Sequence, residues 1–166
     1  VCSSDLLIGD MGFNSLGGDI TFLSDVNGAY ALVLNACEGG TITAQNIGNT
    51  TRLTTLIART DNLVQSGETL TTGPVTVIGC GDTVSLCGVY DMGSSDFIAA
   101  GNVTLSCNTT ILTSGGEIQF TGTVDGAYDL TLSAGGSSIT FGGIIGGFSR
   151  IRDLVIENTS SVTAVS

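Results

Sequence analysis

Two stretches of this chain have nearly the same sequence, GDITFLSDVNGAYALVLNA at residues 18–36 and GEIQFTGTVDGAYDLTLSA at residues 116–134. The two copies lie 98 residues apart, and apolar residues recur at every second position within each. Alternation of this kind is typical of β-strands that bury one face. The repeat therefore predicts a chain built of β-strands, in which both copies follow one structural pattern.

A period of 98 residues leaves two folds open, because it also fits a tandem array of immunoglobulin-like β-sandwiches. A shorter period favours a solenoid: a shift of 21 residues places Ile118 on Ile139 and Phe120 on Phe141. Each coil of a solenoid must place the same residue type above the last, whereas a sandwich has no reason to repeat in this way. We predict an all-β, right-handed parallel β-helix of 20–21 residues per coil within a 98-residue super-repeat, with the tandem sandwich as the alternative.

This fold predicts interior ladders of apolar residues and corners that contain glycine. About eight coils, at roughly 4.8 Å each, would give a rod on the order of 35–40 Å long. Unpaired strand edges at its ends would favour association with other chains. Glycine at a corner permits a positive φ. The predicted ladders are Ile20–Ile42, Val26–Ile47, Leu32–Leu53, Ile118–Ile139, Phe120–Phe141, Val124–Ile145 and Leu130–Ile151, and the predicted corner glycines are Gly28, Gly126 and Gly147.

The first six residues, VCSSDL, resemble the translated end of a common short-read sequencing adapter. We therefore expect residues 1–6 to be a non-native segment that includes Cys2 and Asp5, with an ordinary polar N-terminus as the alternative. Residues 7–166 are predicted to be a single β-solenoid segment, a metagenomic fragment of a longer repeat protein.

The charge of the chain excludes several kinds of partner. Its net charge is −11, and it has four arginines, no lysine and no histidine. Nucleic-acid binding needs a basic surface, and so does binding to an anionic membrane, so neither partner is expected. No run of about 18 apolar residues is present, so we expect no membrane insertion.

Four cysteines remain once Cys2 is set aside: Cys37, Cys80, Cys87 and Cys107. Their spacing does not fit a zinc site, and no histidine is present to complete a mixed site or to activate a nucleophile. Small buried residues of the coil interior are the favoured interpretation. Disulfides between neighbouring coils come second and a metal site last, and the sequence fixes no pairing.

The acidic and repeated polar residues are interpreted mainly as structural. Tandem G-G-x-G-x-D units, which calcium-binding solenoids need, do not occur. A two-carboxylate site for glycoside hydrolysis stays open, but the sequence singles out no pair: Asp125 and Asp129 flank Gly126–Tyr128, and the first copy has Asn27 and Ala31 at their positions. We assign no catalytic, cofactor-binding or metal-binding residue. Solvated turn residues are the interpretation for Asp19, Asp82, Asp91 and Glu117. Tyr30 and Tyr128 are interpreted as structural corner residues, with sugar stacking as the alternative, and Arg52 and Arg150 as residues that cover a coil rim or pair with an acid such as Asp153. Possible glycosylation sequons begin at Asn49, Asn102, Asn108 and Asn158.

The segment GEIQFTGTVDGAYDLTLSAGGSSITFGGIIGG resembles the repeats of large bacterial surface adhesins of the filamentous-haemagglutinin-like kind. Such repeats carry an ITF strand, a V-x-G turn, an LTL strand and a second ITF strand followed by V-G-G. The corresponding residues here are Ile118–Phe120, Val124–Gly126, Leu130–Leu132, Ile139–Phe141 and Ile145–Gly147. The resemblance implies a right-handed β-helix in a secreted or surface-exposed protein, exported by a two-partner or autotransporter route, without catalytic residues in its repeats.

We therefore expect a structural repeat segment, the stalk or passenger of a bacterial adhesin, that spaces or presents a binding region. Its expected partners are flanking repeats of the same chain and an unknown glycan or protein of a host or cell surface. The expected location is extracellular, at the bacterial cell surface. The alternative is a carbohydrate-active β-helix enzyme, a polysaccharide lyase or hydrolase, for which four arginines and the absence of lysine and tryptophan are unfavourable.

Overall fold

The computed structural model describes residues 5–65 and 67–165 of the chain. Over these residues the chain forms β-strands and no helix, and it winds into a parallel β-solenoid of about 7 turns. The predicted all-β solenoid is confirmed, although the expected eight coils were slightly too many. The tandem sandwich is wrong, because the pairs between the described strands are parallel rather than antiparallel.

The strands differ greatly in length, because some continue around a corner and others stop at it. The strands are β1 (Asp5–Leu6), β2 (Met11–Asn14), β3 (Ile20–Thr21), β4 (Val26–Asn27), β5 (Ala31–Ala44), β6 (Thr55–Gln65), β7 (Glu68–Leu70), β8 (Val75–Asp91), β9 (Phe97–Leu112), β10 (Ile118–Phe120), β11 (Val124–Asp125), β12 (Leu130–Ser133), β13 (Ser138–Phe141), β14 (Leu154–Glu157) and β15 (Ser161–Ala164).

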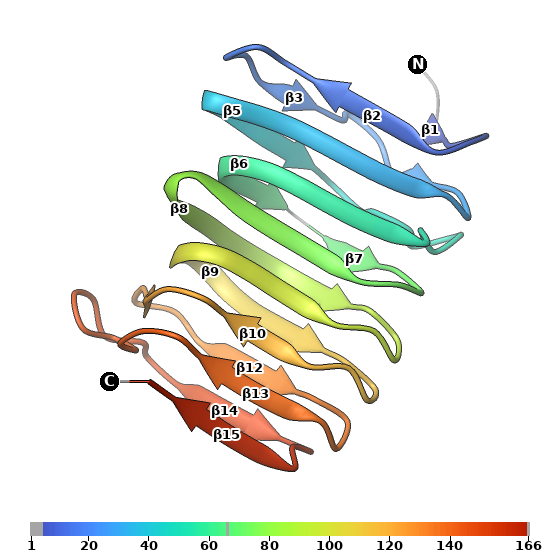
Figure 1. The fold of residues 1–166 in the computed structure, drawn as a ribbon. Helices are drawn as coiled ribbons and strands as arrows, with labels where there is room; N and C mark the ends of the chain where they lie inside the picture. The colour runs from blue at the N-terminus through green and yellow to red at the C-terminus, as the bar shows by residue number, and fades with distance from the viewer. Residues whose placement is uncertain (1–4, 66, 166) are drawn as a thin grey trace.

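The strands stack into three parallel faces, and each coil passes through them in the same order. The first face comprises β2, the beginnings of β5, β6, β8 and β9, then β10, β13 and β15. The second comprises β3, later segments of β5, β6, β8 and β9, then β11. The third comprises β1, β4, β7, the ends of β8 and β9, then β12 and β14. Figure 1 shows the stack, with the two termini at opposite ends.

The interior is a set of apolar ladders, as expected. Ile118 lies beside Ile139, and Phe120 lies beside Phe141 with the two rings stacked at 5.3 Å. The ladders Ile20–Ile42, Val26–Ile47 and Val124–Ile145 are likewise confirmed. Tyr90, Phe97, Phe120 and Phe141 form one aromatic column with centroids 5.3–6.1 Å apart. Each such side chain contributes about 1.5–3 kcal/mol through its burial.

Two predicted ladders are wrong, and both for the same reason. Leu32 lies beside Leu56 rather than Leu53, and Leu130 lies beside Leu154 rather than Ile151. Both of these coils contain 24 residues, because each includes the same enlarged corner. A uniform 21-residue period cannot place a strand that follows such an insertion.

The two sequence copies lie on different faces of the rod. Ile20 is on the second face, whereas its counterpart Ile118 is on the first. Val26 is on the third face, and its counterpart Val124 is on the second. An offset of 98 residues is about four and two-thirds coils, so the second copy is turned by one face relative to the first.

The corners between the first and second faces alternate between wide and narrow. Four residues separate the paired segments at Ala36 and Thr41 of β5, whereas one residue separates Thr60 and Asn62 of β6. β8 again has four residues between Ile78 and Thr83. The wide corners of β5 and β8 therefore project beyond the narrow corner of the coil between them.

Candidate functional site

The repeated sequence builds the same corner twice; we define the repeated corner as residues 26–54 in the first copy and 124–152 in the second. Gly48 N–H donates to Val26 O at 2.6 Å, and its counterpart Gly146 N–H donates to Val124 O at 2.8 Å. Gly28 N–H donates to Thr51 O at 3.2 Å. Its counterpart in the second copy makes the equivalent bond at 3.1 Å.

A side-chain oxygen closes the repeated corner in both copies. Asn27 Oδ1 accepts hydrogen bonds from the N–H groups of Thr50 and Thr51, at 2.9 and 3.1 Å. Asp125 Oδ1 accepts from the equivalent N–H groups of Phe148 and Ser149, at 2.8 and 3.0 Å. The amide and the carboxylate are interchangeable here because both supply an acceptor oxygen to otherwise unpaired backbone groups.

Glycine is required where the repeated corner meets the preceding coil. Gly28 has φ +139° and Gly126 has φ +132°. A Cβ at Gly28 would lie 2.7 Å from Leu7 O, and one at Gly126 would lie 2.7 Å from Leu105 O. The predicted positive φ is thus confirmed for both, but it is wrong for Gly147, since Gly146 is the residue with φ +65°.

The repeated arginines have different surroundings. The Arg52 guanidinium donates to Thr71 O at 3.0 Å, to Asp91 O at 3.1 Å and to Asp91 Oδ2 at 2.7 Å. The hydrogen bond from Arg52 lowers the pKa of the Asp91 carboxyl. Arg150 is exposed and has no ion pair within residues 5–65 and 67–165. The expected pairing with an acid is therefore found at Arg52, with Asp91 as the partner, whereas Arg150 does not pair with Asp153.

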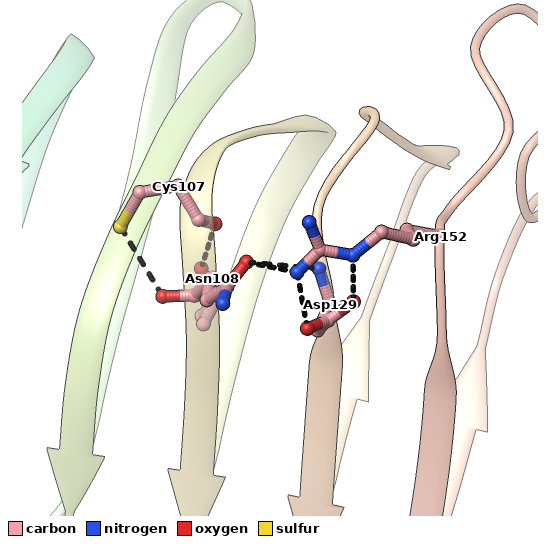
Figure 2. A network of polar contacts seen from close by, with 5 residues as sticks. Cys107, Asn108, Asp129 and Arg152 are labelled. Carbon is pink, nitrogen blue, oxygen red and sulfur yellow. Dashed lines mark hydrogen bonds and ion pairs between the residues drawn. The ribbon is translucent and has the colours of Figure 1, made fainter.

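The second copy has one polar network that the first copy lacks (Figure 2). Arg152 Nε donates to Asp129 Oδ1 at 2.6 Å, and its Nη2 donates to Asn108 Oδ1 at 3.2 Å. The hydrogen bond from Arg152 also lowers the pKa of Asp129. The first copy has Ala31 and Thr54 at the positions of Asp129 and Arg152, so sequence repetition gave no signal for this network.

The Asp125 and Asp129 carboxylates both have structural partners. Asp125 caps two N–H groups of the repeated corner, and Asp129 forms an ion pair with Arg152. A general acid needs a raised pKa, whereas the pKa of Asp129 is lowered by its hydrogen bond from Arg152. These contacts do not favour the glycosidase pair that the sequence left open.

Other acidic side chains hold adjacent coils together at their corners. Asp19 Oδ1 accepts from Thr41 N–H at 2.8 Å, and Asp96 Oδ1 accepts from Glu117 N–H at 2.8 Å. Such acceptors satisfy N–H groups that leave the strand ladders at corners. The interpretation of Asp19 and Glu117 as turn residues is confirmed, and Asp82 also lies in a corner, with φ +64°. The same interpretation is wrong for Asp91, which is the last residue of β8, is half-buried and forms an ion pair with Arg52.

The four cysteines form two disulfides, Cys37–Cys80 and Cys87–Cys107. The favoured prediction of buried free cysteines is wrong, because all four are half-buried and paired. Cys87–Cys107 joins neighbouring coils, as the second interpretation expected. Cys37–Cys80 joins β5 to β8 across β6, which the wide corners of β5 and β8 permit. The sequence could not reveal this pairing, because it depends on the relative widths of three corners.

The remaining candidate residues lie on the surface. Tyr30 and Tyr128 are each 39% exposed and lie inside the repeated corner, just before β5 and β12, which agrees with a corner role. The sequon residues Asn49, Asn102, Asn108 and Asn158 are exposed, and Asn49 Nδ2 donates to Asp25 at 2.8 Å. Within the described part of the chain, no group of three His, Cys, Asp or Glu residues could hold a metal ion. None of the described residues forms a helix long and apolar enough to span a membrane.

A hollow of about 680 Å³ lies beside the ends of β9 and β12. It is lined by Leu112, Thr113, Ser114, Ser133, Gly135, Gly136, Asn158 and Thr159. These residues offer hydroxyl, amide and backbone groups, and no charged side chain is in the lining. The hollow therefore supplies hydrogen-bonding groups but no titrating pair.

A scan against protein-family models, a search of curated proteins and a search of solved structures each found no match to this chain.

Proposed function

We propose that this chain is a structural β-solenoid segment, the stalk or passenger of a large secreted or surface-exposed bacterial adhesin of the filamentous-haemagglutinin-like kind. Its role is to space or present a binding region. The host or cell-surface glycan or protein that such a region would bind is not identified by any residue described above.

One observation carries the proposal: the backbone hydrogen bonds of the repeated corner, and the side-chain oxygen that closes it, recur on two different faces of the rod. The groups that recur act on the chain's own backbone. The Asn27 and Asp125 oxygens accept hydrogen bonds from backbone N–H groups, and Gly28 and Gly126 leave room for the backbone of the preceding coil. A repeated ligand site would favour one face, so that several copies could meet the same partner. Repetition of backbone contacts on changing faces instead favours a scaffold whose length is its function.

The two disulfides support a location outside the cytoplasm. Disulfides persist in oxidising compartments such as the periplasm and the cell exterior. Those of this chain cross-link β5 to β8 and β8 to β9, and so hold the middle of the rod together. This agrees with secretion, and attachment to the cell surface is part of the proposal.

We do not propose the enzyme alternative, because no observation favours it. The hollow beside the ends of β9 and β12 has no charged side chain in its lining, and Asp125 and Asp129 have structural partners. We accordingly propose a non-enzymatic role.

The spacer role is tested by placing one, two and four tandem copies between a surface anchor and a fluorescent tag. The mean height of the tag above the surface is measured by interferometric microscopy. About 7 turns at roughly 4.8 Å predict that each added copy raises the tag by about 34 Å, in proportion to copy number. Glycine–serine linkers of equal length are the control, because their height grows with the square root of length. Square-root growth for the solenoid copies would contradict the proposal.

A further inference from the structure

Asn27 is the one asparagine of this chain that glycine follows directly. Asparagine is a thermally labile residue, because a main-chain nitrogen can attack the carbonyl carbon of its side chain. Glycine as the next residue favours that attack, since it has no side chain to hinder the approach of its own nitrogen. The pair Asn27–Gly28 is therefore the position of this sequence most prone to lose a side-chain amide.

The chemistry needs only the chain and water. Gly28 N loses its proton to a solvent base and bonds to Asn27 Cγ, the Cγ–Nδ2 bond breaks, and Nδ2 takes a proton and leaves as ammonia. Water then opens the resulting cyclic imide at one of its two carbonyl carbons. Attack at Cγ gives aspartate with the original main chain. Attack at the main-chain carbonyl carbon gives isoaspartate, in which the main chain runs through the former side chain.

The repeated corner restrains both reacting groups in the folded chain. Gly28 N–H donates to Thr51 O at 3.2 Å, which withholds its proton from a solvent base. Asn27 Oδ1 is held by the N–H groups of Thr50 and Thr51, at 2.9 and 3.1 Å, and Asn27 is only 4% exposed. Attack by Gly28 N therefore has to wait until the corner opens locally and frees both groups.

The second copy shows that the corner accepts an aspartate in this place. Asp125 occupies the position of Asn27, and its Oδ1 accepts from the equivalent pair of N–H groups at 2.8 and 3.0 Å. An aspartate formed at position 27 can close the corner with the same bonds, because they use only the side-chain oxygen.

The corner has no room for the other product. Isoaspartate adds one carbon to the main chain immediately before Gly28. A Cβ built on Gly28 would already lie 2.7 Å from both the O and the Cβ atoms of Leu7, in the preceding coil. The isoaspartate form should therefore leave the repeated corner open.

We propose that Asn27 is a site of spontaneous hydrolytic deamidation, and that opening of the repeated corner controls its rate. Each conversion releases ammonia and adds one negative charge to the chain, so it records an opening of the corner irreversibly. The proposal goes beyond the stalk role and does not depend on it, because it concerns the corner itself.

The test compares the full chain in its folded state with the same chain in concentrated guanidinium chloride, at mildly alkaline pH. Conversion at Asn27 is followed by peptide mapping with mass spectrometry, which separates aspartate from isoaspartate. Hydrogen exchange of the Gly28 amide, measured on the folded chain under the same conditions, reports how often the corner opens.

Two variants separate the repeated corner from the rest of the rod. Asp25→Ala loosens this corner, because Asp25 accepts hydrogen bonds from Asn46 Nδ2 at 2.9 Å and from Asn49 Nδ2 at 2.8 Å. Asp61→Ala is the matched control, since it removes a carboxylate that accepts from Gly81 N–H at 2.7 Å in a different corner. Circular dichroism shows that each variant is folded.

Asn27 should deamidate at least tenfold more slowly in the folded chain than in denaturant. The slowing should be at least as large as the exchange protection of the Gly28 amide, because attack requires that N–H to be free. Asp25→Ala should speed conversion in the folded chain at least threefold, and Asp61→Ala should change it less than twofold. Asp125→Asn should create a second slow site in the equivalent corner, which keeps the test available if Asp25→Ala does not fold.

Three results would overturn the proposal. The first is no conversion at Asn27 in the unfolded chain, because the residue would then not be a deamidation site. The second is a folded chain that converts as fast as the unfolded one, or with less slowing than the exchange protection of Gly28. The third is a larger acceleration by Asp61→Ala than by Asp25→Ala, because the repeated corner would then not control the rate.

Discussion

The two disulfides should limit how far the chain can be pulled, by amounts that follow directly from their positions. When a molecule is stretched between its ends, the residues enclosed by a closed disulfide cannot extend. Cys37–Cys80 encloses a separation of 43 residues and Cys87–Cys107 one of 20 residues. At about 3.5 Å per extended residue, these loops hide roughly 150 Å and roughly 70 Å of contour length.

The assay is single-molecule force spectroscopy on the chain in a Cys2→Ser background, with and without a reductant. Cys37→Ser/Cys80→Ser should lengthen the fully unfolded chain by about 150 Å, and Cys87→Ser/Cys107→Ser should lengthen it by about 70 Å. Reduction of the unaltered chain should give both increments together, and reduction should not lengthen the chain that lacks all four cysteines.

The same variants should also be less stable in equilibrium unfolding. The loop-closure model gives about 4 kcal/mol for the 43-residue loop and about 3 kcal/mol for the 20-residue loop. The reasoning would be refuted if the first pair of substitutions released more than about 200 Å, because Cys37 and Cys80 would then be paired with cysteines other than each other. An unchanged contour length would refute it as well, since no disulfide would have been present.

Two further perturbations test the repeated corner. Gly28→Ala and Gly126→Ala should each destabilise the chain by at least about 2 kcal/mol in chemical denaturation, because both residues have a positive φ and a Cβ would meet the backbone of the preceding coil. Gly9→Ala, which has open space at its Cβ, is the control, and an equally large effect there would contradict the argument. Arg52→Gln should cost about 1–2 kcal/mol at pH 7, because it removes a charge-assisted hydrogen bond to the partly exposed Asp91. The lowered pKa of Asp91 means that this contribution is present above its unfolded pKa of about 4 and is lost as pH falls through the folded pKa. The difference in unfolding free energy between Arg52→Gln and the unaltered chain should therefore shrink as pH falls through the folded pKa of Asp91, to the part that comes from the hydrogen bonds to the Thr71 and Asp91 carbonyls. A difference that does not change with pH would count against the ion pair.

The sequence predicted the fold and several ladders because inward side chains stack in register. Ile118 on Ile139 and Phe120 on Phe141 follow from a constant period of 21 residues. The same period gave the wrong partner for Leu130, because the enlarged corner before Leu154 adds three residues to that coil. Periodicity is informative along a uniform stack and fails where a corner changes its length.

The rotation of the second sequence copy by one face of the rod, relative to the first copy, could have been inferred from the sequence. A 98-residue offset is not a whole number of 21-residue coils, so equivalent residues such as Ile20 and Ile118 had to fall on different faces. The disulfide across β6 could not have been inferred, because the two wide corners and the narrow one between them emerge only from strand pairing. The Arg152–Asp129 pair was missed for a different reason, since it is unique to the second copy.

The most direct test of this account is the register of the strands in solution, measured through cross-strand nuclear Overhauser effects between backbone amide and Hα protons. The account predicts contacts that link Thr131 with Val155, Gln119 with Thr140 and Gln119 with Ile98, in the pattern of parallel strands. Contacts between Thr131 and Arg152 would instead indicate a uniform 21-residue register without the enlarged corner. Strong contacts between Hα protons of facing residues would indicate antiparallel strands and would contradict the solenoid itself.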